Sequence, residues 1–120
     1  DLIRPSLYQA RHKIFALSGC EIFDECKKEQ LKELKFSPCD VVGPICESGD
    51  FLAKDRNLPP LNPGDLVAIK SAGAYGFAMS SNYNTRGRVA EGAVKGGEDF
   101  LIRRRESFED IVALEREFLG

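Results

Sequence analysis

The chain has 120 residues and a mass of 13.3 kDa, which is near the modal size of a single domain and enough to bury a core. Its apolar fraction of 42% and charged fraction of 30% indicate a soluble globular protein and exclude a disordered tail. The net charge of -2 gives no electrostatic case for binding nucleic acid or an anionic membrane. No apolar run is long enough to span a bilayer, and residues 1–20 lack the continuous apolar stretch of a signal peptide.

The first half of the chain predicts short strands around a charged segment. A proline at a first helical position favours a short helical turn at residues 4–8. A strand is expected at residues 12–17. Residues 19–36 are dense in Lys and Glu, and we expect a surface insertion there, with at most one short helix. Residues 39–46 are typical of a buried strand that bends or ends at its Gly-Pro pair, because proline cannot donate to a sheet ladder.

The second half continues this pattern and ends in a helix. Residues 55–65 predict a loop, and residues 66–70 predict the next strand. Residues 88–105 predict a β-hairpin folded about a Gly-Gly turn. Ser107 and Asp110 have the spacing of a capping box at the start of an amphipathic helix. The predicted fold is therefore mainly β, a compact Greek-key-like barrel or sandwich with a short C-terminal helix.

The termini and the cysteines give two further expectations. The chain begins at Asp1 and not at Met, so we expect a piece of a longer protein. Its four cysteines match no zinc pattern and include no C-x-x-C pair. Two disulfides stay possible, but nothing else suggests secretion, and we expect reduced thiols in a cytoplasmic protein.

Chemistry is expected first at the end of the 39–46 strand. A thiol, Cys46, stands there beside two carboxylates, Glu47 and Asp50. A thiol can donate a proton, and a carboxylate can hold an ammonium group. Local sequence alone favours an ordinary polar turn beside a cysteine.

Two other segments have compositions that packing does not require. Glycines on both sides of residues 74–75 would let the backbone approach a ligand, and the Tyr75 hydroxyl could meet a phosphate. Near the N-terminus, Arg4 could clamp a carboxylate, with the hydroxyl of Tyr8 one turn later. A tight turn, a solvated arginine and packed tyrosines explain the same residues without function.

The order of these motifs resembles the C-terminal β-domain of the diaminopimelate decarboxylase family. The resemblance covers nearly the whole chain and is carried by five strings: Arg4-Pro5-Ser6-Leu7-Tyr8, Val41 to Asp50, Gly64-Asp65, Ser71 to Phe77, and Ser81-Asn82-Tyr83-Asn84. It implies a fold-type III enzyme with an N-terminal TIM-like barrel that is absent from this chain. Residues 1–120 would then form a single domain of a longer enzyme. That enzyme converts meso-2,6-diaminopimelate to L-lysine and CO2 as a homodimer with pyridoxal 5'-phosphate.

The resemblance also implies roles for particular residues. Cys46 matches a proton donor that reaches into the partner subunit's site, and Glu47 matches a substrate-binding acid. Tyr75 matches a tyrosine that contacts both cofactor and substrate. Arg4 and Tyr8 match residues that hold the carboxylate at the non-reacting end of the small amino-acid substrate. These residue types suit the task, since a second amino-acid end needs paired polar groups.

The family's cofactor-binding lysine belongs to the missing barrel, and none of the eight lysines here inherits its role. We therefore expect the isolated chain to be inactive. Two alternatives stay open. One is a related fold-type III decarboxylase that acts on another basic amino acid or a carboxypolyamine. The other is a non-catalytic β-barrel interaction module without an exposed apolar face.

Overall fold

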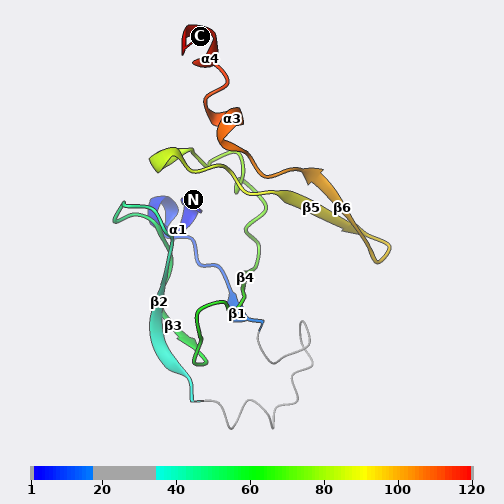
Figure 1. The fold of residues 1–120 in the computed structure, drawn as a ribbon. Coiled ribbons are helices and arrows are strands. Elements are labelled where there is room, and N and C mark those ends of the chain that lie inside the picture. The colour runs from blue at the N-terminus through cyan, green and yellow to red at the C-terminus, as the bar shows by residue number, and fades with distance from the viewer. Residues whose placement is uncertain (1, 18–34, 120) are drawn as a thin grey trace.

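The computed structural model describes residues 2–17 and 35–119. The helical elements are α1 (Arg4–Tyr8), η1 (Tyr83–Thr85), α3 (Phe108–Ile111) and α4 (Arg116–Leu119). The strands are β1 (Ile14–Ala16), β2 (Ser37–Val42), β3 (Phe51–Leu58), β4 (Val67–Ile69), β5 (Glu91–Lys95) and β6 (Glu98–Arg103). This mainly-strand content with few short helices confirms the predicted fold class (Figure 1). Most of the predicted insertion at 19–36 lies outside the described residues.

The described strands pair as three antiparallel ribbons: β1 with β4, β2 with β3, and β5 with β6. The β1–β4 pair joins two strands far apart in the chain, with Ile14 opposite Ile69. The other two ribbons are local hairpins. Closure of these ribbons into a barrel stays a prediction, because each described sheet has two strands.

The β2–β3 ribbon confirms one prediction and corrects two others. β2 ends at Val42, directly before the Gly-Pro pair, as expected. The expectation that this strand is buried is wrong, because five of its six residues are exposed and Val41 is only half-buried. The loop predicted from residue 55 is wrong at its start, because β3 continues to Leu58 and pairs Arg56 with Cys39. Polar residues can extend this strand because its backbone pairs with β2, while Lys54, Asp55 and Asn57 stay exposed to solvent. The ladder is irregular near Asp55, where the register shifts between Cys39 and Val41. The Asp55 N–H is nevertheless satisfied, since it donates to an Asp40 carboxylate oxygen at 2.9 Å.

The C-terminal third contains the predicted hairpin. Gly96 and Gly97 both have positive φ angles, 62° and 85°, as a two-residue turn between β5 and β6 requires. The predicted capping box is also present, since the Ser107 and Asp110 side chains each accept from the other's backbone N–H. The helix that follows is not continuous, however, and α3 ends before α4 begins. Short helices depend on packing of their apolar face against the rest of the protein. That packing is missing here, because Leu114, which lies between α3 and α4, is 86% exposed.

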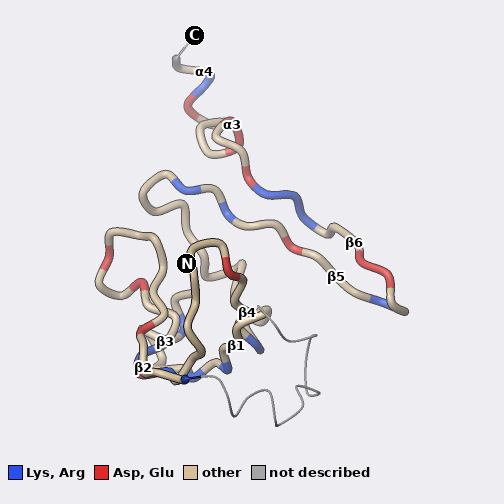
Figure 2. Tube along the Cα trace, turned by 60° about the horizontal axis from the view of Figure 1, so that its bottom comes forward, with Lys and Arg blue, Asp and Glu red and all other residues tan. Residues whose placement is uncertain are grey.

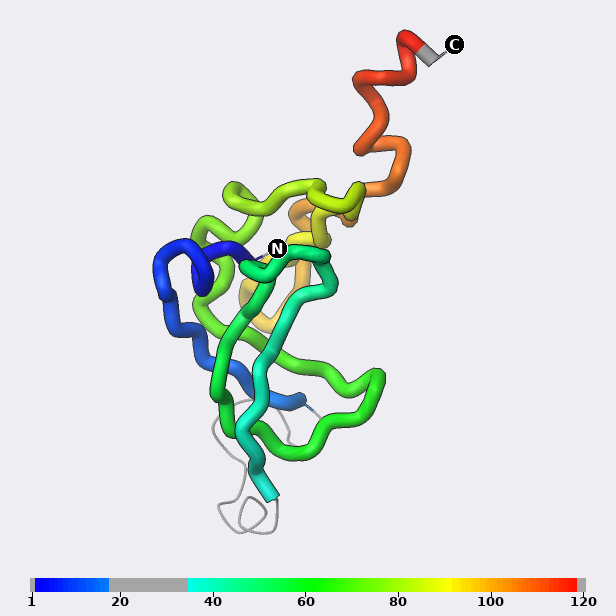
Figure 3. Tube along the Cα trace, turned by 90° about the vertical axis from the view of Figure 1, so that its left-hand side faces the viewer, coloured from blue at the N-terminus to red at the C-terminus, as the bar shows by residue number. Residues whose placement is uncertain are grey.

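The described part of the chain has little core. Its buried residues are Pro5, His12, Ala53 and Leu58. The radius of gyration is 17.4 Å, whereas a compact domain of this length would have about 14 Å. The C-terminal helices project away from the rest of the chain (Figure 3). Large apolar side chains consequently lie open on β5, β6, α3 and α4, among them Val94, Leu101, Ile102, Phe108 and Phe118.

Candidate functional site

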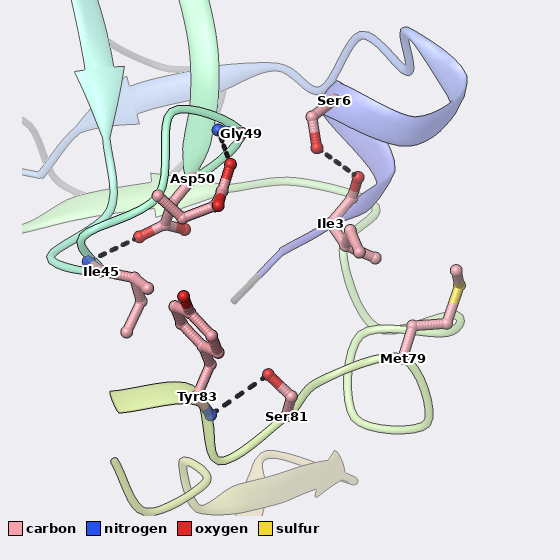
Figure 4. A pocket seen from close by; sticks show the side chains of 9 residues that line it. Ile3, Ser6, Ile45, Gly49, Asp50, Met79, Ser81 and Tyr83 are labelled. Carbon is pink, nitrogen blue, oxygen red and sulfur yellow. Dashed lines mark hydrogen bonds between the residues drawn. The ribbon is translucent and has the colours of Figure 1, made fainter. Parts of the chain in front are cut away.

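Three segments far apart in the sequence form one pocket of about 270 Å³. It lies between α1, the loop after β2 and the stretch that leads into η1 (Figure 4). The lining residues are Ile3, Ser6, Ile45, Glu47, Gly49, Asp50, Met79, Ser81 and Tyr83. Tyr83 points toward the loop that carries Ile45 and Asp50. The pocket is therefore an apolar hollow with carboxylates on one wall and hydroxyls on the others.

The loop from Gly43 to Asp50 is folded around the Asp50 side chain. One Asp50 carboxylate oxygen accepts the N–H of Ile45 at 2.8 Å, and the Asp50 carbonyl accepts the N–H of Gly43 at 2.7 Å. A Cβ placed on Gly43 would lie 2.0 Å from that carboxylate. A side chain at position 43 would therefore displace the Asp50 carboxylate, whose hydrogen bond to Ile45 fixes the shape of the loop.

This fixed loop presents both Glu47 and Cys46. A Glu47 carboxylate oxygen accepts the Gly49 N–H at 3.0 Å and the Ser48 hydroxyl at 3.3 Å, which holds the acid against the pocket wall. The Cys46 thiol is free and exposed, between two residues that line the pocket. The loop thus offers an ordered carboxylate and an accessible thiol side by side.

Arg4 lies on α1, the helix whose Ser6 lines the pocket, and its guanidinium is near two tyrosine rings. The Arg4 guanidinium carbon is 5.9 Å from the ring centre of Tyr8 and 5.2 Å from that of Tyr75. The Arg4 Nε is buried without a hydrogen-bond partner in the described structure. Tyr75 is 61% exposed and has a φ angle of 64°, a strained conformation for a tyrosine. Such strain collects at functional sites, and an unpaired arginine donor beside exposed hydroxyls suits a carboxylate or phosphate.

The segment that carries Tyr83 is anchored from the hairpin. Asn84 and Thr85 have positive φ angles of 59° and 57°, so this stretch is not regular helix. The carboxylate of Glu106, just after β6, holds it in place. Hydrogen bonds from the Arg88 backbone N–H and then from the Asn82 amide lower the Glu106 pKa. Glu106 is therefore a firm anionic anchor at neutral pH.

The structure brings the sequence-predicted residues into one region, in two groups. Arg4 contacts Tyr8 and Tyr75, while Glu47 lines the pocket and Cys46 lies next to it on the same loop.

The prediction missed the pocket residues of the third segment, Met79, Ser81 and Tyr83. The Ser81 to Asn84 string contributed to the family resemblance, but no local pattern in it indicated a role. Ile3 and Ser6 were also missed, because only folding places them against the loop.

Comparison with known proteins identifies the class. Residues 1–73 match the model of a family described as the C-terminal sheet domain of pyridoxal-dependent decarboxylases. That match covers more than half of the 120 residues, and the chain belongs to this family.

Within that class the chain is similar to diaminopimelate decarboxylases. It is 54% identical to the enzyme of Campylobacter jejuni over 99% of this chain and 26% of that protein. It is 45% identical to the enzyme of Helicobacter pylori strain J99 over 99% of this chain and 27% of that protein.

Solved structures of similar proteins support the same family assignment. A Helicobacter pylori diaminopimelate decarboxylase in complex with L-lysine superimposes with a TM-score of 0.79 at 44% identity, over 96% of this chain and 25% of that one. The crystal structure of AQ1208 from Aquifex aeolicus gives a TM-score of 0.80 at 48% identity, over 96% of this chain and 26% of that one. The predicted resemblance is confirmed, and the chain spans about a quarter of the length of the relatives it matches.

Two further properties bear on the kind of site. Among the described residues, no group of His, Cys, Asp and Glu side chains has the arrangement of a metal site. No helix of the described chain is long and apolar enough to cross a membrane.

Proposed function

We propose that this chain acts as the C-terminal β-domain of a pyridoxal-phosphate-dependent decarboxylase that converts meso-2,6-diaminopimelate to L-lysine and CO2. The observation that carries the proposal is the 54% identity to a diaminopimelate decarboxylase over 99% of the chain. Residues 1–120 form one domain in this proposal. The reaction belongs to lysine biosynthesis in the cytoplasm.

The substrate's non-reacting end is recognised by the cation and phenol group. Arg4 pairs with the distal carboxylate, and its unpaired buried Nε supports this role because a buried donor needs an acceptor. Tyr8 adds its hydroxyl to the same carboxylate. Glu47 binds the distal ammonium, which its ordered position at the pocket wall supports. Together they select a substrate with a second amino-acid end.

This domain contributes one contact to the cofactor, through Tyr75. When bound, pyridoxal phosphate takes up the electron pair released as CO2 leaves. The exposed Tyr75 contacts both the cofactor and the substrate in this proposal, because its hydroxyl can donate to a phosphate. The lysine that binds the cofactor covalently comes from outside this chain.

The proton that replaces CO2 comes from Cys46. Its thiol is free and exposed on a loop that a hydrogen bond to Asp50 orders, which supports a role for the Sγ in a neighbouring subunit's site. A thiol can deliver such a proton near neutral pH. The proposal therefore includes a homodimer in which each subunit completes the other's site.

The exposed apolar side chains support a larger assembly. Val94, Leu101 and Ile102 on the hairpin are 78%, 69% and 67% exposed, and Phe118 on α4 is 87% exposed. Such surfaces are rarely left open in monomers. They suit contact with an N-terminal TIM-like barrel and with a second subunit, and they argue against an independent interaction module.

The test is decarboxylation by the full-length gene product that contains this chain. We expect bound pyridoxal phosphate and CO2 release from meso-2,6-diaminopimelate, with little release from ornithine, arginine or a carboxypolyamine. Preference for one of those substrates would favour the related decarboxylase. The isolated chain is expected to release no CO2, and measurable turnover by it would contradict the proposed division of residues.

A further inference from the structure

A second cluster of polar side chains lies just outside the pocket, centred on Arg88. Its guanidinium donates to the hydroxyl of Ser80 at 3.1 Å, to the carbonyl of Ser80 at 3.3 Å and to the side-chain oxygen of Asn82 at 2.8 Å. One arginine thus holds the residues on both sides of Ser81. The planar fork of a guanidinium suits such simultaneous contacts.

Glu106 secures the other side of this cluster. Its two carboxylate oxygens accept from the Arg88 guanidinium at 3.2 Å, from the Arg88 backbone N–H at 2.8 Å and from the Asn82 amide at 2.7 Å. The backbones also meet closely, since a Cβ on Gly87 would lie 2.6 Å from the Glu106 carbonyl oxygen. Both charged side chains are about one-quarter exposed, so solvent screens the pair only partly.

The geometry connects this cluster to the pocket wall. Ser81 and Tyr83 line the pocket, and the Tyr83 N–H is 3.3 Å from the Ser81 hydroxyl that accepts it. Ser80 and Asn82, which Arg88 holds, flank Ser81, and Asn82 directly precedes Tyr83. Figure 2 shows the two chain segments of the cluster side by side, one entering β5 and one leaving β6. Arg88 and Glu106, at the open end of the β5–β6 hairpin, therefore support the pocket wall formed by Ser81 and Tyr83.

We infer that Arg88, seated on Glu106, is a positioning residue that fixes Ser81 and Tyr83 and thereby sets affinity for the substrate. This inference rests on the proposed function. Arg88 does not line the pocket, so it acts through the wall and not on the reacting atoms. Its effect should consequently appear in substrate binding more than in the chemical step.

The test compares matched variants of the full-length gene product. R88K keeps the positive charge but loses the planar guanidinium that contacts Ser80 and Asn82 together. E106Q removes the negative charge and keeps one acceptor oxygen in place. R104K is the control, because Arg104 forms an ion pair with Asp110 near α3 and does not contact residues 80–83. We measure KM and kcat for meso-2,6-diaminopimelate, and amide hydrogen exchange at residues 80–86.

We expect R88K to raise KM at least fivefold with kcat within twofold of wild type, and to speed exchange at residues 80–86. E106Q should give a smaller rise in KM, which keeps the test intact if R88K does not fold. R104K should leave both readouts unchanged. Unchanged KM in R88K and E106Q, or a fall in kcat alone, would overturn the inference.

The exchange measurement separates this inference from the proposed function. If the wild-type protein does not decarboxylate the substrate, the proposed function fails. Faster exchange at residues 80–86 in R88K would then still support the positioning of Ser81 and Tyr83. Unchanged exchange in R88K would overturn that positioning whatever the activity.

Discussion

Replacing Gly43 by alanine should damage the proposed site from a position outside the pocket. The new Cβ would lie 2.0 Å from the Asp50 carboxylate, which must move. That movement breaks the 2.8 Å hydrogen bond from the Ile45 N–H and releases the loop that presents Cys46 and Glu47. A hydrogen bond to a charged group contributes roughly 1.5–3 kcal/mol to stability, so losing it from the ordered loop should lower kcat/KM by at most about 10- to 150-fold.

The assay is steady-state CO2 release by the full-length protein. The matched control is Gly92→Ala, where the added Cβ makes an ordinary 3.4 Å contact with the Phe100 carbonyl oxygen. A double-mutant cycle with Asp50→Ala isolates the cause, because removing the carboxylate makes room for the Cβ. Gly43→Ala should then lower kcat/KM much less in the Asp50→Ala background than in the wild-type protein. Equal losses in both backgrounds, or activity of Gly43→Ala within twofold of Gly92→Ala, would refute the reasoning.

Three further predictions concern the binding group, the thiol and the helix cap. Arg4→Lys loses the guanidinium fork, so KM for meso-2,6-diaminopimelate should rise about tenfold in steady-state kinetics; an unchanged KM would remove Arg4 from substrate binding. Cys46→Ala should lower kcat about 10²- to 10⁴-fold, the usual contribution of a general acid, and leave cofactor absorbance intact; wild-type kcat would exclude the thiol as proton donor. The Asp110 pKa lies below its ordinary value of 3.8 because the Arg104 side chain and then the Ser107 N–H bond its carboxylate. The capping box should therefore be fully formed above that value and lost as the pH falls through the lowered pKa, and an NMR titration of the Asp110 carboxyl with a midpoint at or above 3.8 would contradict this.

Local sequence determined the elements whose chemistry is local. The Gly-Pro pair after Val42 ends β2, because proline has no N–H for a ladder. The Gly-Gly turn and the Ser107–Asp110 capping box also follow from residues within a few positions of each other. The motif order was enough to indicate the family. The five proposed site residues stood out by local composition, but local sequence alone favoured ordinary turns and packing, and the motif order gave these residues their roles.

Only the tertiary structure decided which residues share the pocket. Tyr83 and Ser81 meet Ser6 and Ile45 across long stretches of chain, and no periodicity within their own segments encodes that approach. β3 extends through polar residues because the β2 backbone pairs with it, which overrides their loop preference. The Arg88–Glu106 support likewise joins residues 18 positions apart, so its role became visible only when folding placed both ends of the hairpin beside the pocket wall. Contacts of this kind depend on the whole chain, and that is the physical reason why the sequence alone did not reveal them.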